Sequence, residues 1–359
     1  MKDLLKPGIH WLFVFVPVSI VLEHREASAP MIFFSAALSI VPIARLISTS
    51  TENLATYTGD AVGGLLNATF GNLPELIIAM VALRAGLHEM VLASLAGAIL
   101  ANLLLALGVA FLVGGIRYHN QEYNVTSVRV YSSMMLIAVI SLMVPSSFHL
   151  LLSGESVAQE NVLNVSLVVV LLIGYVLYLV FMIKTHPDFF RSEKGSHEAH
   201  HAKPWSLPRA LISLVVASAL AALMSEVLVG AAEETGNVLG MSSVFIGVIF
   251  LSVVGGAAES ISAITMAAKN KMDLSIGIAL GSSIQVALFI APLLVLMSLF
   301  VGPMQLNLTF PRGLIVALFL AVILGAMIVS DGRSNWYKGV QLIIVYVIMA
   351  MLLYFIPGA

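Results

Sequence analysis

The chain has 359 residues, of which 60% are hydrophobic and only 10% are charged, and its formal net charge is -2. Soluble domains carry about 25% charged residues, so this composition excludes a soluble globular protein and predicts a polytopic membrane protein. The lack of cysteine excludes disulfides, thiolate metal sites and a cysteine nucleophile. The small net charge gives no indication of nucleic-acid binding.

Eleven segments are apolar enough to cross a bilayer as helices, for which about 20 residues suffice. The first also resembles a secretory signal peptide, because Lys2 and Lys6 precede a short apolar run and Ala27-Ser28-Ala29 resembles a cleavage site. Charged residues 23–26, just before that site, favour an uncleaved helix. The expected spans are centred on residues 9–22, 29–47, 60–84, 88–115, 126–144, 161–183, 208–231, 243–268, 273–300, 311–330 and 337–356.

The distribution of Lys and Arg predicts the orientation of these spans. With the N-terminus in the cytoplasm and the C-terminus outside, only Arg25, Arg84 and Arg312 of the 17 basic residues fall outside. Such an asymmetry is what the positive-inside rule predicts. The basic residues expected on the cytoplasmic side are Lys2, Lys6, Arg45, Arg117, Arg129, Lys184, Arg191, Lys194, Lys203, Arg209, Lys269, Lys271, Arg333 and Lys338.

One sizeable hydrophilic segment divides the chain into two halves. We expect an additional N-terminal transmembrane helix at residues 1–28, a first five-helix repeat at 29–183, a cytoplasmic linker at 184–207 and a second five-helix repeat at 208–359. The linker contains His186, His197, His200 and His201. A histidine cluster of this kind can bind a transition metal or sense pH, but a solvated linker is the simpler interpretation and is preferred.

Two related stretches interrupt the third and eighth spans: Gly71-Asn72-Leu73-Pro74-Glu75 and Gly255-Gly256-Ala257-Ala258-Glu259. Because the third span is expected to run outwards and the eighth inwards, the two repeats have inverted topology, which commonly places a substrate site at the bilayer midplane. The residues Gly63, Gly71, Glu75, Ile77, Ala79 and Gly97 recur in register as Gly247, Gly255, Glu259, Ile261, Ala263 and Gly281.

The chemistry of these stretches predicts a cation site. An ionised carboxylate inside a membrane is costly, so Glu75 and Glu259 are functional candidates. Glycine and proline at the same depth indicate interrupted helices, whose freed carbonyls are tolerated where they line a cavity or bind a solute. Pro74 suits the first turn of the following half-helix. Carbonyls near Gly71 and Gly255 and the two carboxylates therefore predict a site for a hard cation.

The next helix of each half supplies further oxygen atoms. Asn102 in one half, and Ser282, Ser283 and Gln285 in the other, could bind the ion directly or through water, and Asn102 could equally serve only in interhelical hydrogen bonding. Gly97 and Gly281 are expected to let these helices approach the broken ones closely. Two carboxylates with carbonyls and amides suit Ca²⁺ better than Mg²⁺. Zn²⁺ and Cu²⁺ lack their preferred ligands, and Na⁺ remains an alternative.

Competition between a cation and protons for such a site predicts that the protein exchanges one for the other. When the cation leaves, two facing carboxylates in a poorly solvated cavity repel each other, so proton uptake is the expected response, and any titration belongs to the pair. The site then holds either one divalent cation or protons. Glu52 and Glu226 begin or end the helices that precede the broken ones, and we expect a role in gating or ion access for them.

These residues resemble the calcium/cation antiporter superfamily and, within it, the cation/proton exchangers. The resemblance rests on the first motif, residues 63–77, and on Lys269-Asn270-Lys271-Met272-Asp273-Leu274 and residues 281–292 of the second half. It implies that Glu75 and Glu259 carry the cation and protons and that Asn72 and Gln285 assist. The second motif usually reads Gly-Asn-Ala-Ala-Glu-His, whereas this chain has Gly256 and Ser260. The departure bears on cation choice and proton stoichiometry, and Ser260 joins Glu52 and Glu226 as a candidate for gating or access.

The sequence therefore predicts an all-α polytopic membrane protein, not an enzyme, that exports Ca²⁺ from the cytoplasm in exchange for H⁺ across a prokaryotic plasma membrane. Alternating access would expose the shared carboxylate site to each side in turn. No cofactor and no nucleic-acid partner are expected, and a homo-oligomer is compatible with the sequence. A Na⁺/Ca²⁺ exchanger is the nearest alternative. A passive cation channel and an intramembrane hydrolase are more distant ones.

Overall fold

The computed structural model describes residues 8–58, 63, 66, 69–151, 157–187 and 205–355. Lys2, Lys6 and most of the expected linker, with His197, His200 and His201, lie outside the described residues. The first half contains η2 (Ile9–Val14), α1 (Phe15–His24), α2 (Ala29–Ala55), α4 (Leu73–Arg84), α5 (His88–Leu100), η3 (Ala101–Ala106), α6 (Leu107–Tyr118), β1 (Gln121–Glu122), α7 (Val125–Leu151), α8 (Val157–Val180) and η4 (Phe181–Thr185).

The second half has the same helical character. Its elements are α9 (Leu207–Gly230), α10 (Ala232–Leu239), α11 (Ser243–Phe245), η6 (Ile246–Leu251), α12 (Ser252–Gly255), α13 (Ala257–Ala268), α14 (Met272–Gln285), η7 (Val286–Ile290), α15 (Ala291–Ser298), α16 (Arg312–Ile328), β2 (Arg333–Ser334) and α17 (Trp336–Phe355). The segments η3, η4, η6 and η7 are π-helical turns that continue their helices.

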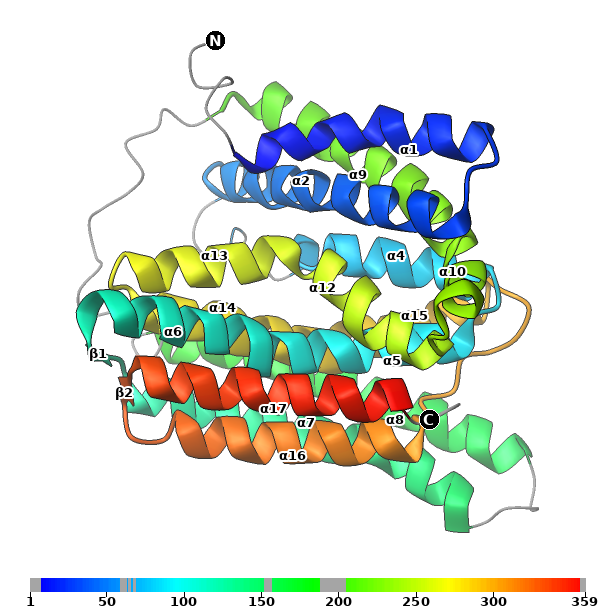
Figure 1. Cartoon of the computed structure of the whole chain (residues 1–359). Helices are drawn as coiled ribbons and strands as arrows, with labels where there is room; N and C mark the ends of the chain where they lie inside the picture. The colour runs from blue at the N-terminus through cyan, green and yellow to red at the C-terminus, as the bar shows by residue number, and fades with distance from the viewer. Residues whose placement is uncertain are drawn as a thin grey trace.

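The predicted fold class is confirmed. Among the described residues, seven helices are each long and apolar enough to span a membrane, and a pair bent by 59°, Ser243–Gly255 and Ala257–Ala268, makes an eighth. The helices Ile9–His24 and Arg312–Ile328 are shorter and apolar. The remaining expected span ends in α4, and its first part falls largely outside the described residues. In Figure 1, α4 and α13 run in opposite directions along the bundle, as inverted repeats require.

Contacts between loops sort the helix ends into two sets. At one end β1 pairs antiparallel with β2, and Asn124 N donates to Asp273 Oδ1 over 2.6 Å. At the opposite end His88 contacts the Met304 carbonyl at 3.2 Å, and Asn164 Nδ2 donates to the Leu306 carbonyl over 3.1 Å. Each set joins loops or helix ends that the expected topology places on the same side of the membrane.

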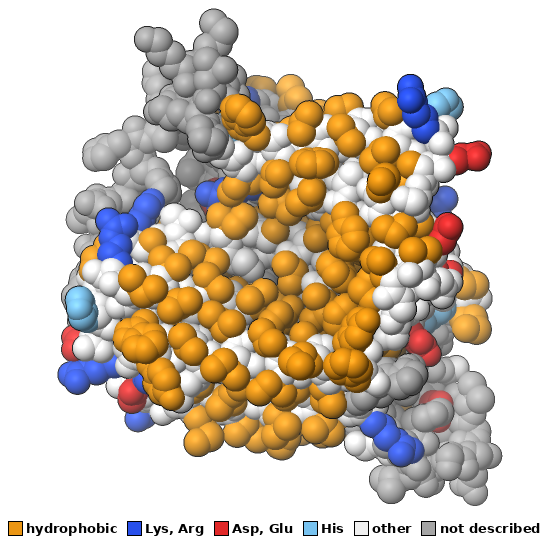
Figure 2. Space-filling view, viewed as in Figure 1, with side chains coloured by type: hydrophobic (Ala, Val, Ile, Leu, Met, Phe, Trp, Pro, Cys, Tyr) orange, Lys and Arg blue, Asp and Glu red, His pale blue; other side chains and the backbone are white. Residues whose placement is uncertain are grey.

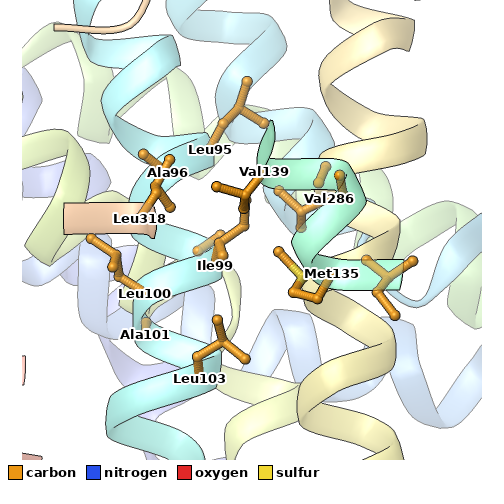
Figure 3. Packing of buried hydrophobic residues seen from close by; sticks show 14 of the residues in the cluster. Leu95, Ala96, Ile99, Leu100, Ala101, Leu103, Met135, Val139, Val286 and Leu318 are labelled. Carbon is orange, nitrogen blue, oxygen red and sulfur yellow. The ribbon is translucent and has the colours of Figure 1, made fainter. Parts of the chain in front are cut away.

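The core is built around α5, where every residue from Met90 to Leu100 is buried. Figure 3 shows Leu95 and Ile99 of this helix packed with Val139 from α7, Val286 from η7 and Leu318 from α16. Because α5 has no face left for lipid, it belongs to the interior of the bundle, beside the broken helices.

Small residues permit the central crossing between the halves. A Cβ atom built on Gly97 would lie 2.4 Å from the Val248 carbonyl oxygen, and one on Gly247 would lie 2.7 Å from Ala93 Cβ. The predicted close approach is thus confirmed for Gly97. It is wrong for Gly281, where no atom of the described residues lies within 4 Å of a built Cβ, because this glycine borders a cavity.

The helices α1, α2 and α9 form a layer on one side of the bundle (Figure 1). The α2 and α9 helices pack along each other, and an apolar cluster that includes Phe33, Ile40 and Met224 joins them to α10 and to the neighbouring α4, η6 and α12. Figure 2 shows hydrophobic side chains across the middle of the visible face, with charged side chains confined to its two edges. A lipid-facing belt between two aqueous ends accounts for this distribution.

Candidate cation site

Both helix interruptions lie where the glycine motifs predict them. In the eighth span, α12 ends at Gly255 and α13 begins at Ala257. In the third span, residues 71–72 form a turn and α4 begins at Leu73, with Pro74 in its first turn. Glu75 and Glu259 occupy the first turns of α4 and α13. A carboxylate at this position interacts favourably with the partial positive charge of a helix N-terminus.

The break in one half packs directly against the carboxylate of the other. A Cβ atom built on Gly255 would lie 2.9 Å from Glu75 Cγ. One built on Gly256 would lie 3.5 Å from Glu75 Oε1 and 3.8 Å from Asn102 Oδ1. Glycine at both positions therefore leaves room for the Glu75 carboxyl group, and the polar atoms of Glu75 and Asn102 converge beside Gly256.

A hydrogen-bonded cluster joins the two halves beside this point. The Ser282 hydroxyl donates to Asn72 Oδ1 over 2.8 Å and accepts from Asn102 Nδ2 over 3.0 Å. Asn72 Nδ2 also donates to the Ser282 carbonyl over 3.4 Å. All three side chains are buried. The cluster fixes the amide groups of two helices from the first half against α14 of the second.

Replacement of Ser282 by alanine is expected to lower the thermal unfolding midpoint in detergent. The change leaves Asn72 Oδ1 and Asn102 Nδ2 without this partner, and each buried unpaired polar group costs about 1–3 kcal/mol. Ser283→Ala is the matched control, because the Ser283 hydroxyl donates to the Ala279 carbonyl within α14 and, among the described residues, makes no hydrogen bond to another helix. Equal midpoints for the two variants, measured by fluorescence-detected thermal unfolding, would contradict this account.

A cavity of about 390 Å³ reaches this cluster from one end of the bundle. Glu259, Asn72, Ser282 and Gln285 line its inner part, together with Gly71 and Gly281, while Glu52 and Asp273 line it nearer the β1–β2 end. Glu75 does not border this cavity and lies only 7% exposed behind it. The two carboxylates thus differ in access: an ion entering from the β1–β2 end meets Glu259 first.

Several buried polar atoms of the site have no hydrogen-bond partner in another residue of the described chain. They are both carboxylate oxygens of Glu75, Oε2 of Glu259 and Nε2 of Gln285. Buried polar groups are otherwise nearly always paired, so an unpaired one calls for an explanation such as an ion that the site accepts. Carboxylate oxygens are ligands that Ca²⁺ and other hard cations prefer.

The remaining candidates lie at different depths. Glu52 is exposed in the cavity mouth, where its Oε1 accepts from the Ser48 hydroxyl over 3.3 Å. Glu226 lies near the opposite end and forms an exposed ion pair with Arg84 at 3.6 Å. Ser260 and Ser283 do not line the cavity, and Ser283 is fully buried within its helix.

Sequence reasoning missed part of the cavity wall. Tyr131, Tyr175 and Tyr178 line it from α7 and α8, and Ser262 lines it from α13. The Ser262 hydroxyl accepts a hydrogen bond of 2.7 Å from Arg45 Nη1 of α2. The position of Arg45 could have been anticipated, because it is a basic residue within an apolar span. Such residues usually face the interior of a bundle.

Two broken helices of opposite direction, each with a buried carboxylate in the first turn after its break and one of them lining an internal polar cavity, define a polytopic ion transporter. The family model of the sodium/calcium exchanger protein matches residues 28–184 and 209–355, so the chain belongs to this family.

Relatives of known name extend this finding. The chain is 38% identical to a Ca²⁺/H⁺ antiporter of Aphanothece halophytica, with 96% of each sequence covered. It is 39% identical to the Ca²⁺/H⁺ antiporter ChaA of Bacillus subtilis, with 94% of this chain and 95% of that protein covered. The solved structure of native YfkE matches with a TM-score of 0.84 at 36% identity, covering 97% of this chain and 100% of YfkE.

Proposed function

We propose that this protein is a secondary antiporter that exports Ca²⁺ in exchange for H⁺ by alternating access, and that Glu75 and Glu259 form the shared binding site. The observation that carries the proposal is the pair of carboxylates at equivalent helix breaks, with three of their four oxygens buried and unpaired within the described chain. The names of the antiporter relatives support the choice of ions.

The geometry suggests how the ion is bound. A cation that enters the cavity reaches Glu259 and the amide oxygen of Gln285, and Glu75 completes the site from behind the break at Gly255. Carbonyls near Gly71 and Gly255, and the oxygens of Asn72, Asn102 and Ser282, are within the same region. Two carboxylates neutralise one Ca²⁺ or take up two protons, and the loss of one cargo favours the binding of the other.

We assign the cavity end to the cytoplasm of a cell whose plasma membrane holds the protein. Lys269, Lys271, Arg333 and Lys338 lie at this end, which the positive-inside rule places in the cytoplasm. In this orientation the cavity admits cytoplasmic Ca²⁺, and the end of α17 lies outside. The additional helix at residues 1–28, the repeats at 29–183 and 208–359 and the linker at 184–207 are retained as the domain division.

A Na⁺/Ca²⁺ exchanger is the second candidate, because the matching family model carries that name. Both candidates carry Ca²⁺, so the charge of the two carboxylates does not separate them, and the relatives named Ca²⁺/H⁺ antiporters favour protons as the counter-ion. The site residues Ser282 and Gln285 add only neutral oxygens. We therefore place proton exchange first.

The test is uptake of radioactive calcium into proteoliposomes at clamped membrane potential, with either a proton or a sodium gradient imposed. We expect uptake with the proton gradient and none above background with the sodium gradient. Uptake that follows sodium would move the function to Na⁺/Ca²⁺ exchange. Uptake with neither gradient would indicate a channel.

A further inference from the structure

Arg45 lies inside the candidate membrane span α2, whereas the charge distribution of the sequence places it among the basic residues of the cytoplasmic side. It lies ten positions before the end of the helix at Ala55, which corresponds to about 15 Å at 1.5 Å per residue. Its side chain is only half-buried, and its neighbours one turn away, Val41, Pro42 and Ser48, carry no charge. A guanidinium at this depth is costly unless it is paired or faces a polar cavity.

The guanidinium of Arg45 points to the cation site. Its Nη1 donates to Ser262 Oγ, which lies one turn beyond Glu259 on α13 and lines the cavity. Residues three apart on a helix share a face, so Arg45 is directed to the face of α13 that carries Glu259. No ion pair joins Arg45 to a carboxylate among the described residues, so any attraction of the guanidinium to Glu259 acts through space.

This hydrogen bond joins two different parts of the bundle. Arg45 belongs to the layer of α1, α2 and α9, whereas Ser262 and Glu259 belong to the broken helix beside the core (Figure 1). The apolar cluster that packs this layer against α4, η6 and α12 provides contacts without directional preference. Arg45 is therefore a polar, charge-dependent link between this layer and the binding site.

We propose that Arg45 is a positioning residue that prevents the empty, negatively charged transporter from changing its access. The proposal rests on the antiport function proposed above. With two ionised carboxylates and no cation, the site has a charge of -2, and Glu259 attracts the guanidinium and holds α2 against α13. A bound Ca²⁺ neutralises the carboxylates and removes this attraction, so the layer moves only when the site is occupied.

Such a lock gives an antiporter its coupling. If the empty site could change sides freely, Ca²⁺ would flow down its gradient without any return of protons. The hydrogen bond from Arg45 to Ser262 orients the guanidinium towards Glu259, so the attraction between these two charges acts in a fixed geometry. Other charged groups near the path are Glu52 on the same face of α2 and Asp273 on α14, both nearer the cavity mouth.

The test measures calcium release from loaded proteoliposomes into calcium-free alkaline medium at clamped potential, with internal pH followed by a trapped dye. The unmodified protein is expected to release little Ca²⁺ until the outer medium is acidified. Arg45→Gln is expected to release Ca²⁺ without acidification and with loss of the accompanying proton influx. Arg45→Lys, which keeps the charge, is expected to restore the proton requirement. Arg129→Gln, at an exposed position on α7, is the control.

Each outcome decides between the two proposals. If the unmodified protein shows no proton-dependent release, the proposed antiport function fails. If it does and Arg45→Gln keeps the full proton requirement, or is inactive while still folded, the role of Arg45 is wrong. Should Arg45→Gln fail to fold, Ser262→Ala replaces it. This variant keeps the charge of Arg45 but removes the hydroxyl that accepts its hydrogen bond. We expect it to release Ca²⁺ without acidification at a rate between that of the unmodified protein and that of fully uncoupled release. Unchanged coupling in Ser262→Ala would then overturn the inference.

Discussion

Glu259→Gln and Glu75→Gln are each expected to reduce proton-driven calcium uptake by roughly 10²–10³-fold while the protein stays folded. Glutamine keeps the volume and one oxygen but removes the charge that a divalent cation needs. Breaking a buried charge pair costs about 3–5 kcal/mol, and each 1.4 kcal/mol corresponds to about tenfold in affinity. The measurement is the initial rate of radioactive calcium uptake into proteoliposomes.

The control for this experiment is Glu234→Gln, which changes an exposed carboxylate on α10 outside the cavity. It is expected to transport at the unmodified rate. Calcium should raise the thermal unfolding midpoint of the control and of the unmodified protein, because a ligand that binds only the folded state stabilises it. Neither site variant should show this rise. Normal transport by Glu75→Gln or Glu259→Gln would remove that residue from the site.

Gly97→Val is expected to prevent the formation of the native bundle. Even a single methyl group at Gly97 meets the Val248 backbone at 2.4–2.5 Å, well inside contact distance. Overpacking of a core costs about 1–3 kcal/mol and sometimes more, and here the obstacle is a backbone at the crossing of α5 and η6, which cannot rotate away. Gel filtration in mild detergent should show aggregation, with little protein at the native position.

Gly174→Ala on α8 is the control for this substitution, because no neighbouring atom of the described residues lies within 4 Å of a built Cβ there. It should elute and unfold like the unmodified protein. Gly97→Ala is expected to lie between the two, with a lower unfolding midpoint and a reduced native peak. A native elution profile for Gly97→Val would show that the central crossing tolerates a wider separation than the structure has.

The parts of the structure that depend on local sequence could be predicted. Long apolar segments specify membrane helices irrespective of their partners, and α13 ends at Ala268 where the expected eighth span ends. Glycine and proline act on their own backbone, so the break before Pro74 and the break at Gly255 were visible as motifs. The position of each glutamate in the first turn after a break follows from the same spacing.

What could not be predicted depends on distant neighbours. Arg45 and Ser262 are 217 residues apart, and no local pattern reports that they meet. The repeat suggested equal roles for Gly97 and Gly281, but Gly97 faces the backbone of η6 and Gly281 faces a cavity. Glu259 lines the cavity and Glu75 does not. This difference describes the one conformation seen here, and the sequence alone does not predict which conformation is seen.

Gly256 stands where the first repeat has Asn72, and this difference contributes to breaking the internal symmetry of the site. In a transporter of inverted repeats, the exchange of inward and outward openings also exchanges the roles of the two halves. Identical halves would present the same ligands to both compartments. Here the first half offers an amide held by Ser282, whereas the second offers bare backbone beside Glu75. In the proposed antiporter, ions arriving from the two compartments would therefore meet chemically different entrances. The affinity for the cation would then differ between the two sides, while the gradients alone set the direction of net transport.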